Sequence, residues 1–476
     1  MYQAIILLLA FLSVAAAYFV FSRRQGKGFD TFLKVFTALF CSIGFFRLML
    51  SDSFVFVING GYYDNVFYDS SDVPQALLRW GYYLNYSVLP MAVFFNSRLF
   101  RNVASYVCLP FSLLSCVFFN DYMPYFLDEQ GRGIHGAPAF RYVYFIIELS
   151  IAIAIPILIM LCHKHVFKIR DGREWLNFLT AVPFMIMLVM PVYVPQATIG
   201  YSKLSATQGS GYHFFWIAML LLVTFSLYYV FRFKPYNERY MLCVFLTIVL
   251  FFHYDSLYLM GFSIPRLPIQ LCNIASYFYM IAIIFRLNKM FQFCFIANVT
   301  GAIIAIILPD FLDGALGFWN MHFILEHSLV LIIPALAMGL RIFPRVTPSS
   351  LKYMWIGFSI YFVFCLSVGI ILNGYSDVTG FEVNYFFLFD IDKAIEYFPF
   401  LRPIGNVYFK FGRFGFYPIF VLGMYLAFLC MCVLFYRAVK FFYTVEDDHL
   451  ELRGSAIELY EKISGKKSKA PKGFVD

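Results

Sequence analysis

The stretch Pro265-Arg266-Leu267-Pro268-Ile269-Gln270-Leu271-Cys272-Asn273-Ile274-Ala275 opens an apolar run that reaches Phe285. Three polar side chains, those of Gln270, Cys272 and Asn273, stand near the start of this run. Because polar groups at membrane depth are costly, they usually face a protein interior or a functional site. The cysteine alone is weaker evidence, since a free thiol packs like a small hydrophobic group.

The composition is that of a protein embedded in a membrane. Of the 476 residues, 61% are hydrophobic and 13% are charged, whereas soluble proteins carry roughly 25% charged residues. The 10 cysteines form no C-x-x-C pair, so neither a disulfide framework nor a zinc site is indicated. We expect no nucleic acid as a partner.

Thirteen apolar runs reach the length of about 20 residues that a membrane-spanning helix needs. The first lacks a charged leading region and a small-residue cleavage site, so we interpret it as a retained helix. The predicted fold class is therefore an all-α polytopic membrane protein with about 13 transmembrane helices. The spans are roughly 3–22, 31–50, 79–99, 104–120, 139–162, 175–196, 212–233, 239–260, 265–285, 291–309, 321–342, 349–372 and 413–437.

The connections between these spans alternate in charge. Every odd connection is basic, as with Lys164 to Arg173 after the fifth span and Arg341 to Arg345 after the eleventh. The even connections are mixed or acidic. Because cytoplasmic loops carry an excess of lysine and arginine, we predict the N-terminus outside and the C-terminus in the cytoplasm.

Two spans share a register that indicates an internal repeat. The segment from Phe145 to Pro156 aligns without a gap with the segment from Phe323 to Pro334, so that Glu148 matches Glu326. Two six-helix units with an even number of crossings insert the same way, which predicts parallel repeats about an axis along the membrane normal. The alternative is chance similarity between hydrophobic helices.

This repeat gives a predicted domain organisation. Cys272 and His327 align with leucines in the first repeat, which therefore lacks the pair and would serve as a scaffold, a lipid platform or a surface for protein partners. The predicted parts are an extra N-terminal transmembrane helix in 1–30, a first six-helix repeat in 31–234, a second in 235–440 with the candidate site, and a basic cytoplasmic tail in 441–476.

Several separated motifs of the second half, within about residues 239–437, resemble one family. The string ending at Cys272 is similar to the L-P-L-x-L-C signature of the YwaF-type bacterial integral membrane proteins. The other motifs are Gly301 to Asp310 for G-A-x-x-A-x-x-x-P-D, Phe323 to His327 for F-F-I-x-H, Asn384 to Leu388 for N-Y-M-F-L, and Phe411 to Tyr417 for L-G-P-W-P-W-Y. The last is degenerate, having lost both prolines and both tryptophans.

The resemblance implies a function. Animal relatives of the family are transmembrane acyltransferases that remodel ether phospholipids, with this cysteine as the proposed nucleophile. It implies a cysteine-dependent lipid acyltransferase or transacylase with Cys272 as the nucleophile, located in a bacterial cytoplasmic membrane.

The predicted topology places the candidate residues at one depth. Cys272 and His327 each lie about seven residues from the outer end of their spans, or roughly 10 Å deep at 1.5 Å per residue. Five separated segments then meet near the outer leaflet, where they would bind headgroups. The further candidates in this slab are His253, Asp255, Asn384, Tyr385 and Tyr417.

These residues allow thiol acyl transfer, because His327 would take the proton of Cys272 and a third group would orient the histidine. His253, Asp255 and Glu326 are the candidate orienting residues. Glu326 is poorly placed, since adjacent residues on a helix project about 100° apart. A phospholipid ester would supply the acyl chain, and a second lipid or an amine would accept it. Membrane phospholipids are therefore the expected partners, and we expect no metal and no soluble cofactor.

The candidate substrate-binding residues and oxyanion donors are polar groups of the same segments. Donors aimed at the oxygen of a tetrahedral intermediate stabilise its negative charge. We expect this role from Gln270, Asn273 and Asn384, with Tyr385 and Tyr417 contributing to substrate binding.

Structural interpretations and other functions remain open. Cys272 could be an inert core thiol, His327 a helix-to-helix hydrogen-bond donor, and Glu326 a structural residue of the repeat. A transporter would also use parallel repeats and buried carboxylates, although transporter sites usually lie at the midplane. A non-catalytic membrane subunit of an assembly would suit the aromatic surface and the unmatched first repeat.

Overall fold

The computed structural model divides the chain into two compact units, which are described separately. The first unit comprises Met1–Ser202 with Phe252–Ser263, and the second comprises Lys203–Phe251 with Ile264–Asp476. The described residues are 1–21, 27–47, 73–95, 97–120, 138–163, 172–189, 206–255, 267–311, 314–380, 382–389, 391–397, 399–411, 414–465 and 467.

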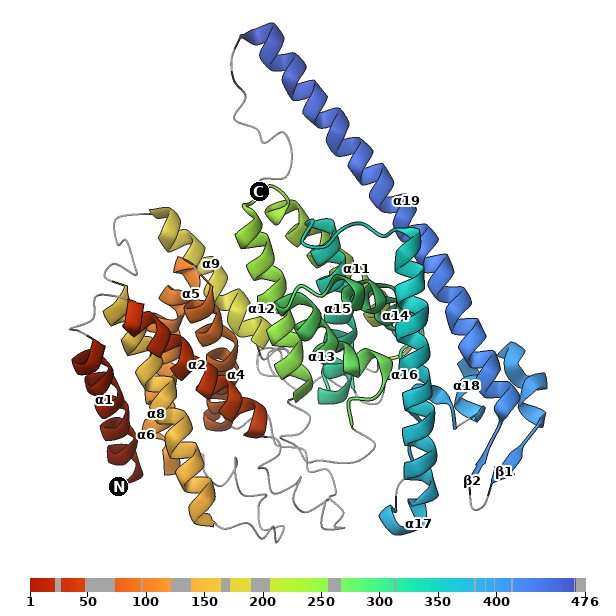
Figure 1. Ribbon diagram of the computed structural model, residues 1–476, viewed down its shortest axis with the longest axis horizontal. Helices are drawn as coiled ribbons and strands as arrows, with labels where there is room; N and C mark the ends of the chain where they lie inside the picture. The colour runs from red at the N-terminus through yellow and green to blue at the C-terminus, as the bar shows by residue number, and fades with distance from the viewer. Residues whose placement is uncertain are drawn as a thin grey trace. The chain divides into compact units, whose positions relative to one another are not determined.

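The first unit is helical throughout its described residues, and α8 is its central helix. Helices α1, α2 and α6 pack against α8, and Ser150 of α8 donates a hydrogen bond to the carbonyl oxygen of Ile6 in α1 at 3.2 Å. Its elements are α1 (Tyr2–Phe21), α2 (Lys27–Arg47), α4 (Val73–Phe94), α5 (Arg98–Val103), the π-helical turn η1 (Ala104–Cys108), α6 (Leu109–Val117), α8 (Pro138–Cys162) and α9 (Gly172–Val189), as Figure 1 shows.

The second unit is also mostly helical, and α14 is its central helix. Helices α13, α15, α16 and α19 all pack against α14. The elements of this unit are α11 (Gly211–Phe231), most of α12 (Tyr236–Asp255), α13 (Leu271–Ile284), α14 (Asn288–Ile307), α15 (Phe318–Gly339), α16 (Pro348–Gly374), α17 (Ser376–Thr379), η4 (Tyr385–Phe387), α18 (Ile391–Tyr397), η5 (Pro399–Asn406), the strands β1 (Phe409–Phe411) and β2 (Phe414–Phe416), and α19 (Pro418–Ser464).

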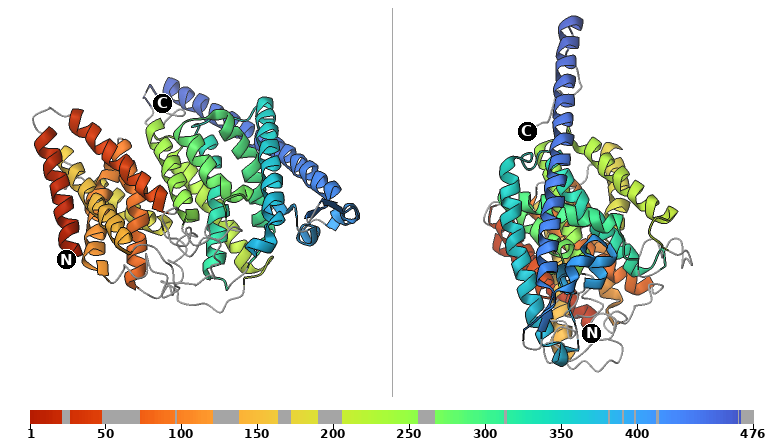
Figure 2. Two further views of the ribbon diagram at one scale, coloured as in Figure 1. Left: turned by 60° about the horizontal axis from the view of Figure 1, so that its bottom comes forward. Right: turned by 90° about the vertical axis from the view of Figure 1, so that its right-hand side faces the viewer.

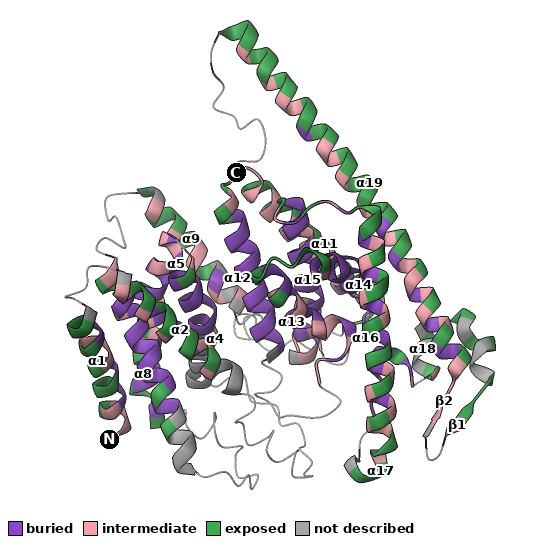
Figure 3. Cartoon of the chain, in the orientation of Figure 1, coloured by how far each residue is buried: buried purple, intermediate pink, exposed green. Residues whose placement is uncertain are grey.

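The position of α14 follows from its sequence. The helix is apolar on all sides, which is typical of a helix surrounded by protein, and its residues from Phe291 to Val299 are buried (Figure 3). Gly357 of α16 leaves room for the ring of Phe293, because a Cβ at this glycine would lie 2.5 Å from the ring Cγ.

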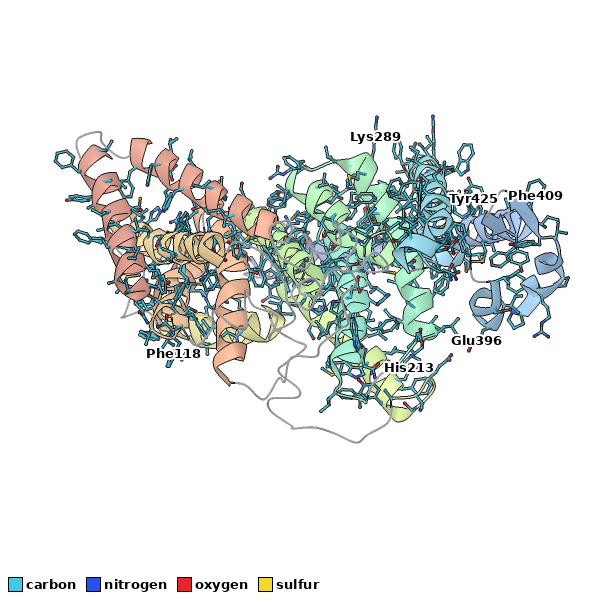
Figure 4. The ribbon with its side chains drawn as sticks, turned by 90° about the horizontal axis from the view of Figure 1, so that it is seen from below. Phe118, His213, Lys289, Glu396, Phe409 and Tyr425 are labelled. Atoms are coloured by element: carbon cyan, nitrogen blue, oxygen red, sulfur yellow. The ribbon has the colours of Figure 1, made fainter. Side chains whose placement is uncertain are left out.

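Two side chains labelled in Figure 4 connect the outer helices of this unit. His213 near the start of α11 accepts from the N–H of Gly209 at 3.0 Å through Nδ1, and its Nε2–H donates to the carbonyl oxygen of Ile306 in α14 at 2.7 Å. Tyr425 of α19 receives a hydrogen bond from the indole of Trp355 in α16 at 2.9 Å. These contacts hold α11 and α16 in place around the site described below.

The structure confirms the predicted fold class. Each of the predicted spans overlaps a helix of the described residues, with the span at 104–120 divided between η1 and α6. Of the described helices, 8 are long and apolar enough to cross a membrane. The short antiparallel hairpin of β1 and β2, in which Phe409 faces Phe416, was not predicted.

Some predictions stay untested. The repeat and its boundaries stay a prediction; in the structure α11, assigned to the first repeat, packs against α15 within the second unit. Parts of the predicted spans, including 48–50, 190–196 and 256–260, lie outside the described residues, as do Pro265, Arg266 and the tail residues 466 and 468–476.

Candidate functional site

The candidate site begins at the N-terminus of α13. The first backbone hydrogen bond of this helix runs from the N–H of Ile274 to the carbonyl oxygen of Gln270, at 2.9 Å. The first three N–H groups of the helix, including that of Cys272, therefore have no acceptor within the helix. These groups and the helix dipole favour negative charge at this end. Cys272 thus lies in the first turn of α13, where N–H groups without an acceptor in the helix are available to an oxyanion beside the sulfur.

Cys272 and His327 lie in the wall of one cavity. The cavity has a volume of about 690 Å³ and a largely aliphatic and aromatic lining, which suits an acyl chain better than a polar metabolite. It is lined by Gln270, Leu271, Cys272, Asn273, Gly301, Ile304, Ala305, Leu308, Asp310, Phe323, His327, Phe386, Phe387, Phe400, Met424, Ala427, Phe428, Cys430 and Met431. Residues from four helices and the loop after α16 therefore line one cavity, and Gln270, Cys272, Asn273 and His327 of the predicted site are among them.

His327 is oriented by the backbone of its own helix. Its Nδ1 lies 2.7 Å from the carbonyl oxygen of Phe323, and its ring packs against the Phe323 ring at a tilt of 35° with centroids 4.2 Å apart. Since a carbonyl oxygen only accepts, Nδ1 carries the proton, and Nε2 of the neutral imidazole is the acceptor. This carbonyl group contacts Nδ1, the ring nitrogen that an orienting side chain was expected to hold.

Glu326 belongs to a different pair. Its Oε2 lies 3.7 Å from Nδ1 of His322, one turn earlier in α15, and both side chains are almost fully buried. The structure therefore places Glu326 with His322, in agreement with the expectation that Glu326 is a poor orienting residue for His327. His322 was missed by the sequence analysis, although a histidine four residues before a glutamate is a recognisable helical pair.

Helix α14 approaches the thiol closely through a glycine. A Cβ on Gly301 would lie 3.8 Å from Cys272 Sγ and 3.1 Å from Leu271 Cδ2. On the same helix, the side-chain amide of Asn298 donates to the carbonyl oxygen of Leu271 at 2.6 Å. These contacts set the first turn of α13 against α14 and hold the thiol at the cavity wall.

Gln270 holds the loop that covers one side of the cavity. Its Nε2 donates to the carbonyl oxygen of Asn384 at 3.0 Å, and its Oε1 accepts from the N–H of Phe386 at 2.9 Å. Phe386 and Phe387 both have φ values near +57°, at 56° and 57°, a region that bulky residues rarely occupy. Gln270 lines the cavity, but its amide is engaged in positioning these two aromatic residues and is not a freely available oxyanion donor.

The other loop candidates have structural contacts as well. Asn384 Oδ1 accepts from the N–H of Phe389 at 2.9 Å, and Tyr385 is 1% exposed. Tyr417 precedes α19 and its ring lies 5.1 Å from that of Tyr408. None of the three is among the cavity-lining residues in the part of the chain that the structure describes.

His253 and Asp255 lie at the end of α12, in the segment assigned to the first unit. His253 is buried, and the side chain of Asp255 lies outside the described residues. Their orienting role stays a prediction. Asp310, which the sequence analysis left out of the site, lines the cavity.

Comparison with known proteins agrees with a membrane protein of this kind. Residues 204–436 match the TMEM164 family, a transmembrane family. The matched segment contains every residue that lines the cavity. Neither the curated proteins nor the solved structures contain a match to the chain. The bacterial YwaF-type identity inferred from the motifs stays a prediction.

Proposed function

We propose that this polytopic membrane protein, whose residues 204–436 match the TMEM164 family, is an acyltransferase that carries a fatty acyl chain on Cys272 as a thioester. The observation that carries the proposal is the shared cavity of Cys272 and His327. In it the thiol lies at a helix N-terminus, and the Nδ1 contact with Phe323 leaves Nε2 of the imidazole as an acceptor. A nucleophile and a base in one apolar pocket are the minimum set for acyl transfer through a covalent intermediate.

The first half-reaction loads the cysteine. His327 Nε2 takes the proton of the Cys272 thiol, and the sulfur attacks the ester carbonyl carbon of a phospholipid. The N–H groups in the first turn of α13 stabilise the resulting oxyanion. The ester C–O bond then breaks, and the departing lysophospholipid oxygen takes the proton from His327. The acyl chain remains on the sulfur.

The second half-reaction returns the enzyme to its starting state. The hydroxyl group of an acceptor lysophospholipid gives its proton to His327 Nε2 and attacks the thioester carbonyl. The C–S bond breaks, and the thiolate recovers the proton from the imidazolium. One ester is lost and one is formed, so the cycle needs no oxidant, reductant or energy source.

The cavity supports a membrane lipid as substrate. Its wall contains Phe386, Phe428 and Met431, with the exposed Asp310 as a charged member. Apolar groups of this kind accept an alkyl chain, and a charged group is tolerated where the headgroup lies. Under the predicted topology, this end of α13 faces the outer leaflet.

A transfer assay tests the proposal. Purified protein in phospholipid vesicles is given an acceptor lysophospholipid and a phospholipid labelled in its acyl chain, and labelled product is measured. Cys272→Ser should abolish transfer. Cys430→Ser is the matched control, because Cys430 is a second thiol in the wall of the same cavity but lies within α19 rather than at a helix N-terminus. Equal activity in wild type and Cys272→Ser would show that Cys272 is not the nucleophile.

A further inference from the structure

The last helix is much longer than a membrane span. α19 runs for 47 residues from Pro418 to Ser464, about 70 Å at 1.5 Å per residue, whereas a bilayer core is about 30 Å thick. Within the second unit it extends past the end of α16, as Figure 2 shows. The segment from Lys440 to Ser464, here called the arm, therefore lies beyond the bilayer core.

One face of the arm is fixed to its own unit. Glu446 and Asp447 form ion pairs with Arg345 at 2.6 and 2.9 Å, and the Tyr443 hydroxyl donates to the carbonyl oxygen of Ala335 at 3.1 Å. Leu450, one turn further along, is buried. These contacts determine which way the opposite face of the arm points.

The opposite face carries a heptad seam that is exposed along its full length. Its members alternate in steps of three and four residues, the spacing of a and d positions in a coiled coil. Phe442 is 70% exposed, Leu452 is 71% and Ile463 is 78%. The complete seam is Phe442, Val445, His449, Leu452, Ala456, Leu459 and Ile463, all exposed (Figure 3). A largely apolar seam of three heptads that is exposed to water is typical of a helix that pairs with another helix.

The charges beside the seam fit a second copy of the same arm. With Phe442 at an a position, Asp448 falls at g and Arg453 at e of the next heptad. In a parallel in-register pair, the g residue of one helix faces the e residue of the next heptad in the other helix. Asp448 of each copy would therefore lie opposite Arg453 of the other copy. Neither side chain forms an ion pair with another described residue of the chain, although the guanidinium of Arg453 lies over the ring of Phe233 in its own unit, 4.3 Å from the centroid.

Membrane insertion supports the same arrangement. Each copy has α19 continuous with its arm, so two copies inserted the same way present their arms in parallel. A membrane surface is a poorer partner for the seam. Between Lys440 and Ser464 there are six acidic and three basic residues, and net negative charge is repelled by anionic lipid.

We propose that the arms of two copies of this protein pair through the seam as a parallel two-stranded coiled coil and hold the protein as a homodimer. His449, the second of the four a positions, would fix the register, since a single polar a residue has this effect in coiled coils.

Cysteine cross-linking of the full chain in vesicles tests the proposal. Leu452→Cys, at a d position, should give a disulfide-linked dimer on mild oxidation. Glu451→Cys, its exposed neighbour outside the seam, should give no more cross-linked dimer than the wild type, whose 10 native cysteines set the background. Equal cross-linking of the two variants would overturn the proposal.

A charge exchange makes the test specific for a second copy. Asp448→Arg alone places like charges opposite each other and should reduce the dimer seen by light scattering in detergent. Asp448→Arg with Arg453→Asp should restore it. A wild type that is monomeric in both detergent and vesicles, or a seam residue that is quenched by lipid-embedded probes, would contradict the proposal and favour the membrane surface as the partner.

Discussion

His327 Nδ1 lies 2.7 Å from the carbonyl oxygen of Phe323, one turn earlier in the same helix. The contact fixes the tautomer through the backbone, so no second side chain is needed for orientation. In the proposed reaction, the imidazolium would therefore be stabilised by a neutral carbonyl group rather than by a carboxylate.

This relationship makes His327 the expected base. His327→Gln should lower the acyl-transfer rate by about 10²- to 10⁴-fold, the usual contribution of a positioned base, without unfolding the protein. Phe323→Leu is the matched control, because it removes the packed ring but keeps the carbonyl group, and it should retain most of the rate. A His327→Gln variant as active as wild type would exclude His327 from the chemistry.

His322 and Glu326 are expected to contribute to stability. His322→Phe leaves the buried Glu326 carboxyl without this partner and should lower the free energy of unfolding by about 1–3 kcal/mol. The double variant His322→Phe with Glu326→Met should recover part of that loss, because apolar residues often replace a buried polar pair without cost. Thermal unfolding of the single and double variants measures the coupling; strictly additive losses would mean that the two side chains do not interact.

Gln270→Leu is expected to loosen the loop at the cavity. The substitution keeps the size of the side chain but removes its hydrogen bonds to Asn384 and Phe386, at a cost of about 1–3 kcal/mol. Amide hydrogen exchange should become faster at Phe386. Gln208→Leu is the control, because the one hydrogen bond of the Gln208 side chain to the described residues is exposed and long, at 3.5 Å. Unchanged exchange in Gln270→Leu would show that other contacts hold the loop.

Gly301 is expected to control access to the thiol. Gly301→Ala needs only a small movement of the Leu271 methyl group, 3.1 Å away from the new Cβ. Gly301→Leu extends toward Cys272 and should slow acyl transfer by about 10²-fold, as a displacement of about 1 Å at a reactive group can. Gly374→Leu is the control, since nothing lies within 4 Å of a Cβ there. A Gly301→Leu variant with normal activity would mean that the thiol does not react from this position.

The parts of the structure that depend on local pattern were predictable from sequence. Each span is a run of about 20 apolar residues, and Cys272 and His327 stood out because motifs carry them. The partner of Gln270 was not predictable, because Asn384 is 114 residues away and no periodicity connects them. The spacing of Glu326 and His327 excluded a direct contact on one helix face, but it did not show that His322 is the partner of the carboxyl.

The continuation of α19 beyond the predicted transmembrane span was not predicted from the sequence. The segment 441–476 was predicted as a basic cytoplasmic tail, and its lysines at 466, 469 and 472 lie outside the described residues. The preceding segment carries a regular heptad pattern that continues the transmembrane helix without a break. Hydropathy marks where a helix leaves the membrane but does not show that it continues in water.

Intact mass spectrometry of the protein, purified gently from its own membrane, tests the central claim most directly. We expect a fatty-acyl adduct on the wild type that neutral hydroxylamine releases, that is absent from Cys272→Ser and that is present in Cys430→Ser. An unmodified Cys272 after incubation with labelled phospholipid, in protein that remains folded, would contradict the thioester mechanism.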